Sequence, residues 1–183
     1  MSNLMDYLDW RGDLTFREAP FNEVDNLILA QLVYVEFAGI VPAPGEEGTI
    51  TVKEACELFF AAHDRKEIME RVSMTKTAAF VLEKMAQTER FCNAQLFGYI
   101  NDISKEEQSQ FSVVCVRLDD KSIYVSFSGT DNTIVGWREN FNMGYLSETP
   151  GQLKAVDYLN HMVKEDWKKI RVGGHSKGGN LSV

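Results

Sequence analysis

Apolar residues in the first part of the chain recur at the spacing of helices. Asn22 can cap a helix that runs to about Phe37, with carboxylates in the first turn, where they suit the helix dipole. Thr51 can cap a second helix that ends near Ala62, and a glutamate three residues on completes a capping box. A third helix is predicted over 75–87. We therefore expect residues 1–90 to be mainly helical.

The pattern changes after Arg90. Three stretches read as strands, over 94–103, 111–118 and 122–127, and Asp119-Asp120 forms a turn between the last two. Apolar residues dominate both faces of the second and third strands. Such strands are typical of a sheet that is covered on both sides, as in α/β proteins.

The last third of the chain alternates between helix and strand. Thr149-Pro150 predicts the start of a helix that runs to about Lys164, and a short strand follows over 169–172. A strand, a helix and another strand in this order predict a right-handed parallel crossover. We therefore expect one α/β domain over 1–183, with its sheet core in 91–183.

Composition and charge narrow the functional classes. The 183 residues are 44% hydrophobic and 25% charged, which is ordinary for a globular protein. The net charge is −8, the isoelectric point is about 4.9, and no Lys/Arg block stands out, so a nucleic-acid partner is disfavoured. No run approaches the ~18 apolar residues of a transmembrane helix, and no signal peptide is visible.

The cysteines and acidic residues do not form a recognisable metal site. Cys56, Cys92 and Cys115 lie far apart with no Cys-x-x-Cys pair, which favours reduced thiols over disulfides or zinc ligands. We therefore predict a cytoplasmic protein that needs no cofactor and no metal. Its oligomeric state is not readable from the sequence.

The strongest chemical signal is a Gly-x-Ser-x-Gly pattern directly after the predicted strand 169–172. Its members Gly174, Ser176 and Gly178 match a nucleophile elbow, in which a sharp strand-to-helix turn exposes a strained serine. The glycines leave room for neighbouring backbone. By chance alone, roughly one chain in twenty of this length would contain the pattern. The surrounding sequence must therefore decide whether it marks a nucleophile.

A second segment could complete this site. Ser128-Gly129-Thr130-Asp131 follows the predicted strand 122–127, and a Gly-Thr turn there could supply oxyanion donors. Taken alone, the segment is better interpreted as a plain capped turn. If the two strands are parallel neighbours, however, this turn and the Ser176 elbow open at the same end of the sheet, where ligands bind in α/β folds. That convergence is the main argument for a hydrolase.

Five segments of the chain together match the pattern of a known family. They are Asp6-Tyr7, Phe21 to Asp25, Val125 to Asp131, Gly136 to Met143 and Gly173 to Leu181. In these segments the chain resembles an uncharacterised bacterial family of α/β-hydrolase-fold proteins related to the class 3 lipases.

The resemblance implies a partial α/β-hydrolase fold with specific roles for these residues. Ser176 would be the nucleophile, the backbone N–H groups of Thr130 and Lys177 would form the oxyanion hole, and Asp131 would help to fix the oxyanion loop. The supporting residues would be Gly129, Asp131, Gly174, His175 and Gly178. The chain departs from the family at Ser128, where Arg is usual, and at Asn140, where Asp is more usual. Without that Arg, the rigidity of the loop is in question.

The sequence offers no convincing acid and base for Ser176. In this fold the acid and the histidine follow the serine, yet only Lys177 to Val183 remain. Among the histidines, His175 should point away from the serine, while His161 and His63 suit surface and helix-end positions. We therefore expect the sequence to be an N-terminal fragment that is catalytically incomplete.

Three functions compete at this point. The first is a serine hydrolase of esterase or lipase type, acting on a small-molecule ester or lipid, and incomplete here. The second is a hydrolase-fold protein that binds a lipid, an acyl ligand or a protein partner without turnover. The third, a phosphate-binding loop over 173–179, is disfavoured because Lys177 follows Ser176, whereas the P-loop lysine precedes its hydroxyl residue.

Overall fold

The chain folds into a mixed α/β structure. The computed structural model describes residues 3–70, 73, 75–131, 133–164, 167 and 169–183. The elements in chain order are α1 (Leu4–Arg11), α2 (Glu23–Leu32), β1 (Ile50–Thr51), α3 (Val52–Ala62), α4 (Arg65–Glu70), α5 (Ala78–Ala86), β2 (Gln95–Ser104), β3 (Ser109–Arg117), β4 (Ile123–Phe127), α6 (Ile134–Asn142), α7 (Pro150–Met162), β5 (Ile170–Gly174) and α8 (Lys177–Leu181).

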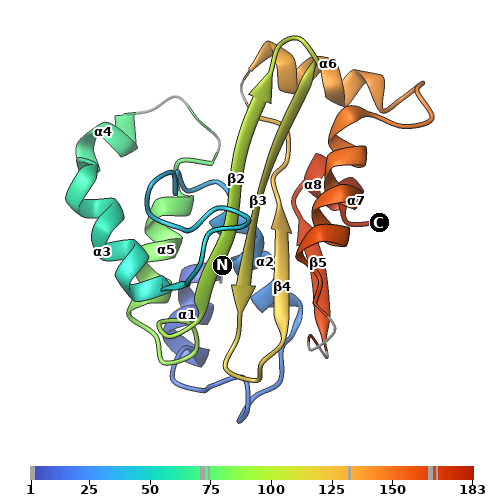
Figure 1. The fold of residues 1–183 in the computed structure, drawn as a ribbon. Helices are drawn as coiled ribbons and strands as arrows, with labels where there is room; N and C mark the ends of the chain where they lie inside the picture. The colour runs from blue at the N-terminus through green and yellow to red at the C-terminus, as the bar shows by residue number, and fades with distance from the viewer. Residues whose placement is uncertain (1–2, 71–72, 74, 132, 165–166, 168) are drawn as a thin grey trace.

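The sheet has five strands in the order β1-β2-β3-β4-β5 (Figure 1). The first four strands pair antiparallel, and β4 pairs with β5 in parallel, with Phe127 opposite Gly174. The predicted parallel neighbours are therefore confirmed. The carboxyl ends of β4 and β5 lie at the same edge of the sheet, beside α6 and α8 (Figure 1).

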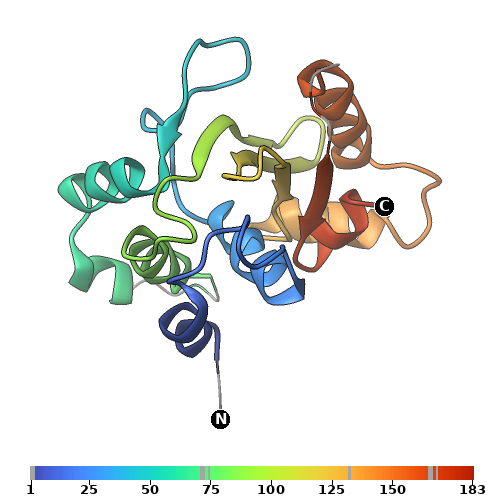
Figure 2. The ribbon, with the colours of Figure 1, turned by 90° about the horizontal axis from the view of Figure 1, so that it is seen from below.

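Helices cover both faces of the sheet (Figure 2). In β4, Tyr124 packs into the larger apolar cluster with α2, α3 and α5, whereas Val125 and Phe127 pack into a second cluster with α7. Every residue of β4 is buried, as are all residues of β3 except the last. The predicted two-sided cover is confirmed. Among the described residues, no helix is both long and apolar enough to cross a membrane.

Capping residues set the helix starts, as the sequence predicts. Asn22, Thr51 and Thr149 each accept a hydrogen bond from the first turn, and each forms a capping box. The expected end of the first of these helices is wrong, because α2 stops at Leu32. Beyond it the backbone turns more tightly, with the N–H of Val35 bonded to the carbonyl of Leu32 at 3.0 Å.

Two helices are absent from the sequence predictions. α4 follows α3 after a break at His63, and α6 fills part of the segment between the Gly129 turn and α7. The third predicted helix, over 75–87, is present in a shorter form as α5.

A buried ion pair ties the N-terminal segment to the rest of the fold. The guanidinium of Arg90 binds the carboxylate of Asp25 through two nitrogens, at 2.8 and 2.6 Å, and both side chains are fully buried. Arg90 also donates to the carbonyls of Leu14 and Ala19, at 2.9 and 3.0 Å, and lies over the ring of Phe16 at 4.0 Å from its centroid. The residues between α1 and α2 are thereby held around one cation.

Candidate active site

Ser176 stands at the sharp turn between β5 and α8. Its φ of 56° and ψ of −123° lie outside the regions that residues with side chains ordinarily adopt, and the residue is exposed. The turn closes with the N–H of Gly178 bonded to the carbonyl of His175 at 3.0 Å. The strand, the strained serine and the helix therefore follow one another as a nucleophile elbow requires.

The turn packs directly against the end of β4. A Cβ added to Gly178 would lie 2.1 Å from the carbonyl oxygen of Phe127, and one added to Gly174 would lie 2.4 Å from the same atom. Both glycines are thus required by the close approach of backbone to backbone.

We expect Gly178→Ala to displace the elbow from β4. The added methyl group overlaps backbone, which cannot rotate away, so the free energy of unfolding should fall by about 1–3 kcal/mol or more. Urea unfolding checks this result, with Gly179→Ala as the control, because a Cβ at Gly179 comes no closer than 3.4 Å to its nearest neighbour. Equal midpoints for the two variants would contradict the packing described here.

The Gly129 turn meets the elbow at the carboxyl edge of the sheet. A Cβ added to Gly129 would lie 2.5 Å from the carbonyl oxygen of His175 and 3.2 Å from Cβ of Ser176. The Gly129 turn and the Ser176 elbow, which the sequence predicts to converge, therefore lie side by side. Lys177 is the first residue of α8, so its N–H has no acceptor within that helix.

Asp131 holds the shape of the turn, whereas the Thr130 side chain makes no hydrogen bond with the described residues. A carboxylate oxygen of Asp131 accepts hydrogen bonds from the backbone N–H and hydroxyl of Thr133, at 2.9 and 2.6 Å. Thr133 in turn caps α6. The hydroxyl oxygen of Thr130 is buried and has no hydrogen-bond partner among the described residues.

Tyr34 is a residue of this site that the sequence analysis did not assign to it. Its hydroxyl accepts the backbone N–H of Gly129 at 2.8 Å and would lie 2.6 Å from a Cβ at that glycine. Burial raises the pKa of the Tyr34 phenol, so the hydroxyl stays protonated. In the sequence, Tyr34 follows a helix pattern and carries no signal that it reaches a turn 95 positions away.

We expect Tyr34→Phe to loosen the Gly129 turn. The variant keeps the ring but leaves the Gly129 N–H without its acceptor, which costs roughly 1–3 kcal/mol for a buried donor. Thermal unfolding measures the loss, with Tyr145→Phe as a control because Tyr145 is an exposed side chain. A variant as stable as the wild type would show that water replaces the hydroxyl at no cost.

The side chain of Lys177 is buried behind the elbow. Its ammonium donates to the backbone carbonyl and the side-chain oxygen of Gln110, the latter at 2.9 Å, and to Glu139 at 2.7 Å. Gln110 also donates to the hydroxyl of Ser128 at 3.0 Å. At the position where the resemblance leads us to expect an arginine, Ser128 is therefore bonded into the network that holds Lys177.

Burial lowers the pKa of Lys177, and the neighbouring Glu139 opposes this effect. Glu139 lies in α6, and neither side chain of this pair is exposed. Glu139 carries no signal in the sequence, since an isolated glutamate in a segment without a clear helical pattern indicates nothing by itself.

The histidines lie outside the hydrogen bonding of this site. His161 bonds the carbonyl of Asp157 and is exposed, and His63 bonds the carbonyl of Phe59 at the end of α3. His175 is exposed beside the serine. In the described part of the chain, neither a histidine nor a carboxylate is hydrogen-bonded to Ser176, and no group of three or more His, Cys, Asp or Glu side chains could hold a metal.

Comparison with known proteins identifies the family. A family model described as Mbeg1-like matches residues 85–183, which is more than half of the chain. The chain belongs to the Mbeg1-like family. Comparisons with the curated proteins and with the solved structures give no match. The part matched to the Mbeg1-like family contains β2 to β5, the Gly129 turn and the elbow, whereas Tyr34 lies outside it.

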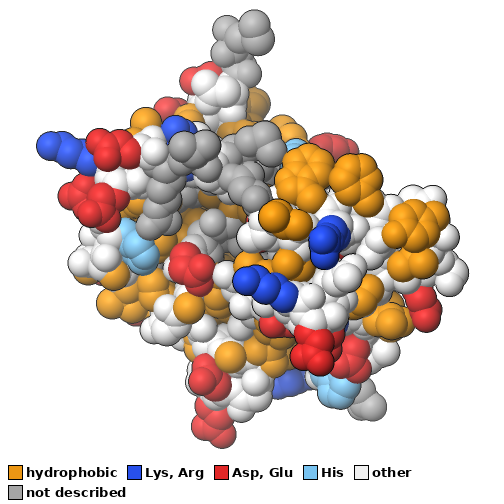
Figure 3. All heavy atoms as spheres, turned by 90° about the horizontal axis from the view of Figure 1, so that it is seen from above, with side chains coloured by type: hydrophobic (Ala, Val, Ile, Leu, Met, Phe, Trp, Pro, Cys, Tyr) orange, Lys and Arg blue, Asp and Glu red, His pale blue; other side chains and the backbone are white. Residues whose placement is uncertain are grey.

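Exposed apolar side chains lie on α6 and on the segment that follows it in this Mbeg1-like chain. The carboxyl edge of the sheet, viewed end-on, carries a group of hydrophobic side chains on the side of α6 (Figure 3). In α6 the exposed members are Ile134, Trp137 and Phe141, and the rings of Trp137 and Phe141 lie 6.4 Å apart. Tyr145 and Leu146 continue the group after the helix.

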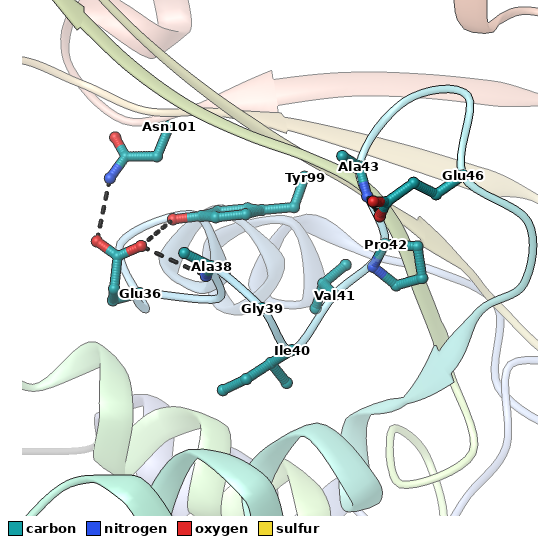
Figure 4. A pocket seen from close by; sticks show the side chains of 10 residues that line it. All are labelled: Glu36, Ala38, Gly39, Ile40, Val41, Pro42, Ala43, Glu46, Tyr99 and Asn101. Atoms are coloured by element: carbon teal, nitrogen blue, oxygen red, sulfur yellow. Dashed lines mark hydrogen bonds between the residues drawn. The ribbon is translucent and has the colours of Figure 1, made fainter.

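A groove of about 520 Å³ lies beside β2 and is lined by Glu36, Tyr99, Asn101 and the loop 38–46 (Figure 4). Its carboxylates are engaged locally: Glu36 accepts from Asn101 at 3.1 Å, and Glu46 accepts from the Ala43 N–H at 2.7 Å. A smaller cavity of about 150 Å³, which shares Tyr99 and Asn101, extends to the Gly129 turn. In this Mbeg1-like chain a polar hollow thus borders the Gly129 turn.

Proposed function

We propose that this chain carries the nucleophile and oxyanion hole of a serine hydrolase acting on carboxylic esters, on an α/β-hydrolase fold. The observation that carries the proposal is the contact between the strained Ser176 and the Gly129 turn at the carboxyl edge of β4 and β5. This edge is where ligands bind in α/β folds. An intracellular location is part of the proposal, because the three free cysteines suit a reducing compartment.

The chemistry follows from the positions of these groups. The Ser176 hydroxyl oxygen attacks the ester carbonyl carbon as a general base takes its proton, and the carbonyl oxygen becomes an oxyanion. The backbone N–H groups of Lys177 and Thr130 stabilise that oxyanion. Collapse of the intermediate breaks the ester bond, and the alcohol leaves with a proton. Water then hydrolyses the acyl-serine to the acid and regenerates Ser176.

The absence of a base on Ser176 among the described residues favours a second candidate. In this alternative the fold binds an acyl ligand, a lipid or a protein partner without turnover, because a serine with an oxyanion hole alone is weakly nucleophilic. The exposed apolar residues of α6 and the hollow beside the Gly129 turn would both suit such a role.

A fluorophosphonate probe separates the two candidates. The full-length gene product is treated with the probe, digested and mapped by mass spectrometry. Labelling at Ser176 would support the hydrolase. The control is Ser147→Ala, in an exposed loop, in which the labelling of Ser176 should be unchanged. Folded protein that stays unlabelled would refute it. A rise in melting temperature of that protein with a long-chain fatty acid would then support acyl binding.

A further inference from the structure

Glu139 is a fully buried carboxylate that joins three elements. One of its oxygens contacts the Lys177 ammonium at 2.7 Å and accepts the backbone N–H of Gln110, in β3, at 3.0 Å. The other accepts the N–H of Gly151, at the start of α7, at 2.7 Å. A single side chain of α6 thereby holds the beginning of β3, α7 and α8 together.

The Lys177 ammonium likewise has three hydrogen-bond acceptors. Its three acceptors are the carbonyl oxygen of Gln110, the side-chain oxygen of Gln110 and the carboxylate of Glu139. Removing two opposite charges from water is costly, and an apolar pair of similar volume is often as stable or more stable. The attraction between the two charges therefore gives little reason to bury a lysine here. The buried N–H groups of Gln110 and Gly151 need an acceptor, which Glu139 supplies, but they do not require a cation beside it.

The place of this pair in the sequence offers a reason. Lys177 directly follows Ser176, and its backbone N–H is the donor that the proposed oxyanion hole needs. Holding the ammonium at three fixed oxygens limits the rotation of the residue, and hence the direction of its N–H. A donor contributes to an oxyanion hole only when it is fixed at the place where the charge develops.

The same network reaches the other half of the proposed oxyanion hole. Gln110, which accepts from Lys177, donates through its side-chain nitrogen to the hydroxyl of Ser128 at 3.0 Å. Ser128 directly precedes Gly129 and Thr130. The chain Glu139–Lys177–Gln110–Ser128 therefore connects α6 to both segments that would bind the oxyanion.

We propose that Glu139 is a positioning residue for the oxyanion hole, acting through the Lys177 ammonium and the Gln110 side chain. This inference rests on the proposed function. Glu139 is buried behind the elbow and donates no proton to substrate, so its effect should be on the rate of the chemical step and not on substrate binding.

The variant Glu139→Gln tests this role in the full-length gene product. It keeps the size of the side chain and removes the charge. We expect kcat for a short-chain p-nitrophenyl ester to fall about 10- to 100-fold, below the roughly 10²- to 10³-fold loss of a whole oxyanion donor, with KM within about twofold. The rate of fluorophosphonate labelling at Ser176 should fall in parallel. Glu148→Gln, at an exposed glutamate before α7, is the matched control.

A second variant separates positioning from folding. Glu139→Met combined with Lys177→Met removes both charges and keeps the backbone N–H at position 177. It should fold with a lowered melting temperature, because the buried N–H groups of Gln110 and Gly151 lose their acceptor. We expect it to react as slowly as Glu139→Gln. Wild-type kcat and labelling in this folded double variant would overturn the positioning role. Lack of labelling in the wild type would instead refute the hydrolase itself, so the two failures are distinguishable.

Discussion

Ser176→Ala in the full-length gene product is expected to lower ester turnover by a factor on the order of 10⁴ or more. The alanine cannot form the acyl intermediate, and the exposed position means that loss of the hydroxyl disturbs no buried partner. Turnover of p-nitrophenyl butyrate measures the effect, with Ser147→Ala as the control. Undiminished turnover in the alanine variant would show that another group is the nucleophile.

A glycine at the same position gives an independent check on the elbow. Ser176 has a φ of 56°, where a side chain is strained and glycine is not. The strain costs alanine about 1–3 kcal/mol, and the extra freedom of glycine in the unfolded chain offsets about 0.4–1 kcal/mol of this difference. We therefore expect Ser176→Gly to be more stable than Ser176→Ala by about 1 kcal/mol net. Both variants should be inactive. An alanine variant more stable than the glycine variant would contradict the strained geometry.

Arg90→Met should cause the largest loss of stability. The substitution leaves the buried carboxylate of Asp25 without its cation, and the carbonyls of Leu14 and Ala19 lose a donor. Breaking a buried ion pair by removing one partner costs about 3–5 kcal/mol. Urea unfolding should therefore show a strongly lowered midpoint, or a chain that does not fold.

Arg17→Met is the matched control for this prediction. Arg17 pairs with Asp119 at 3.9 Å, and its side chain is 70% exposed. Exposed pairs contribute about 0–1 kcal/mol, so this variant should unfold close to the wild type. If the two variants lose similar amounts of unfolding free energy, burial does not determine how much the Arg90 ion pair contributes to stability.

The elements that sequence reasoning identified are those with strong local signals. Thr51 and Thr149 cap helices where predicted, and two-sided apolar strands appear in β3 and β4. α6 was missed because its signals are weak: Gly136 lies in its first turn, and its apolar residues Trp137 and Phe141 face outward instead of forming a buried stripe.

The sequence predicts only those residues of the candidate site that belong to backbone motifs. Gly129 and Ser176 can be identified from the sequence because they belong to short motifs. These motifs reflect the close backbone contacts that glycine allows and the strained turn that holds the serine. Tyr34 and Glu139 reach the same place from distant elements, and their roles depend on distances that a single sequence does not encode. The side chain of Lys177 likewise has no signal in the sequence, since the motif concerns only its backbone N–H.

The parallel pairing of β4 with β5 has a consequence for the order of assembly. The meander from β2 to β4 is joined by short hairpins, which close quickly, whereas β5 must return across the whole of α6 and α7 before it can pair. We therefore expect Ser176 and the Gly129 turn to meet late in folding. A newly made chain is therefore expected to hold Ser176 apart from the proposed oxyanion donors of the Gly129 turn until the sheet is complete.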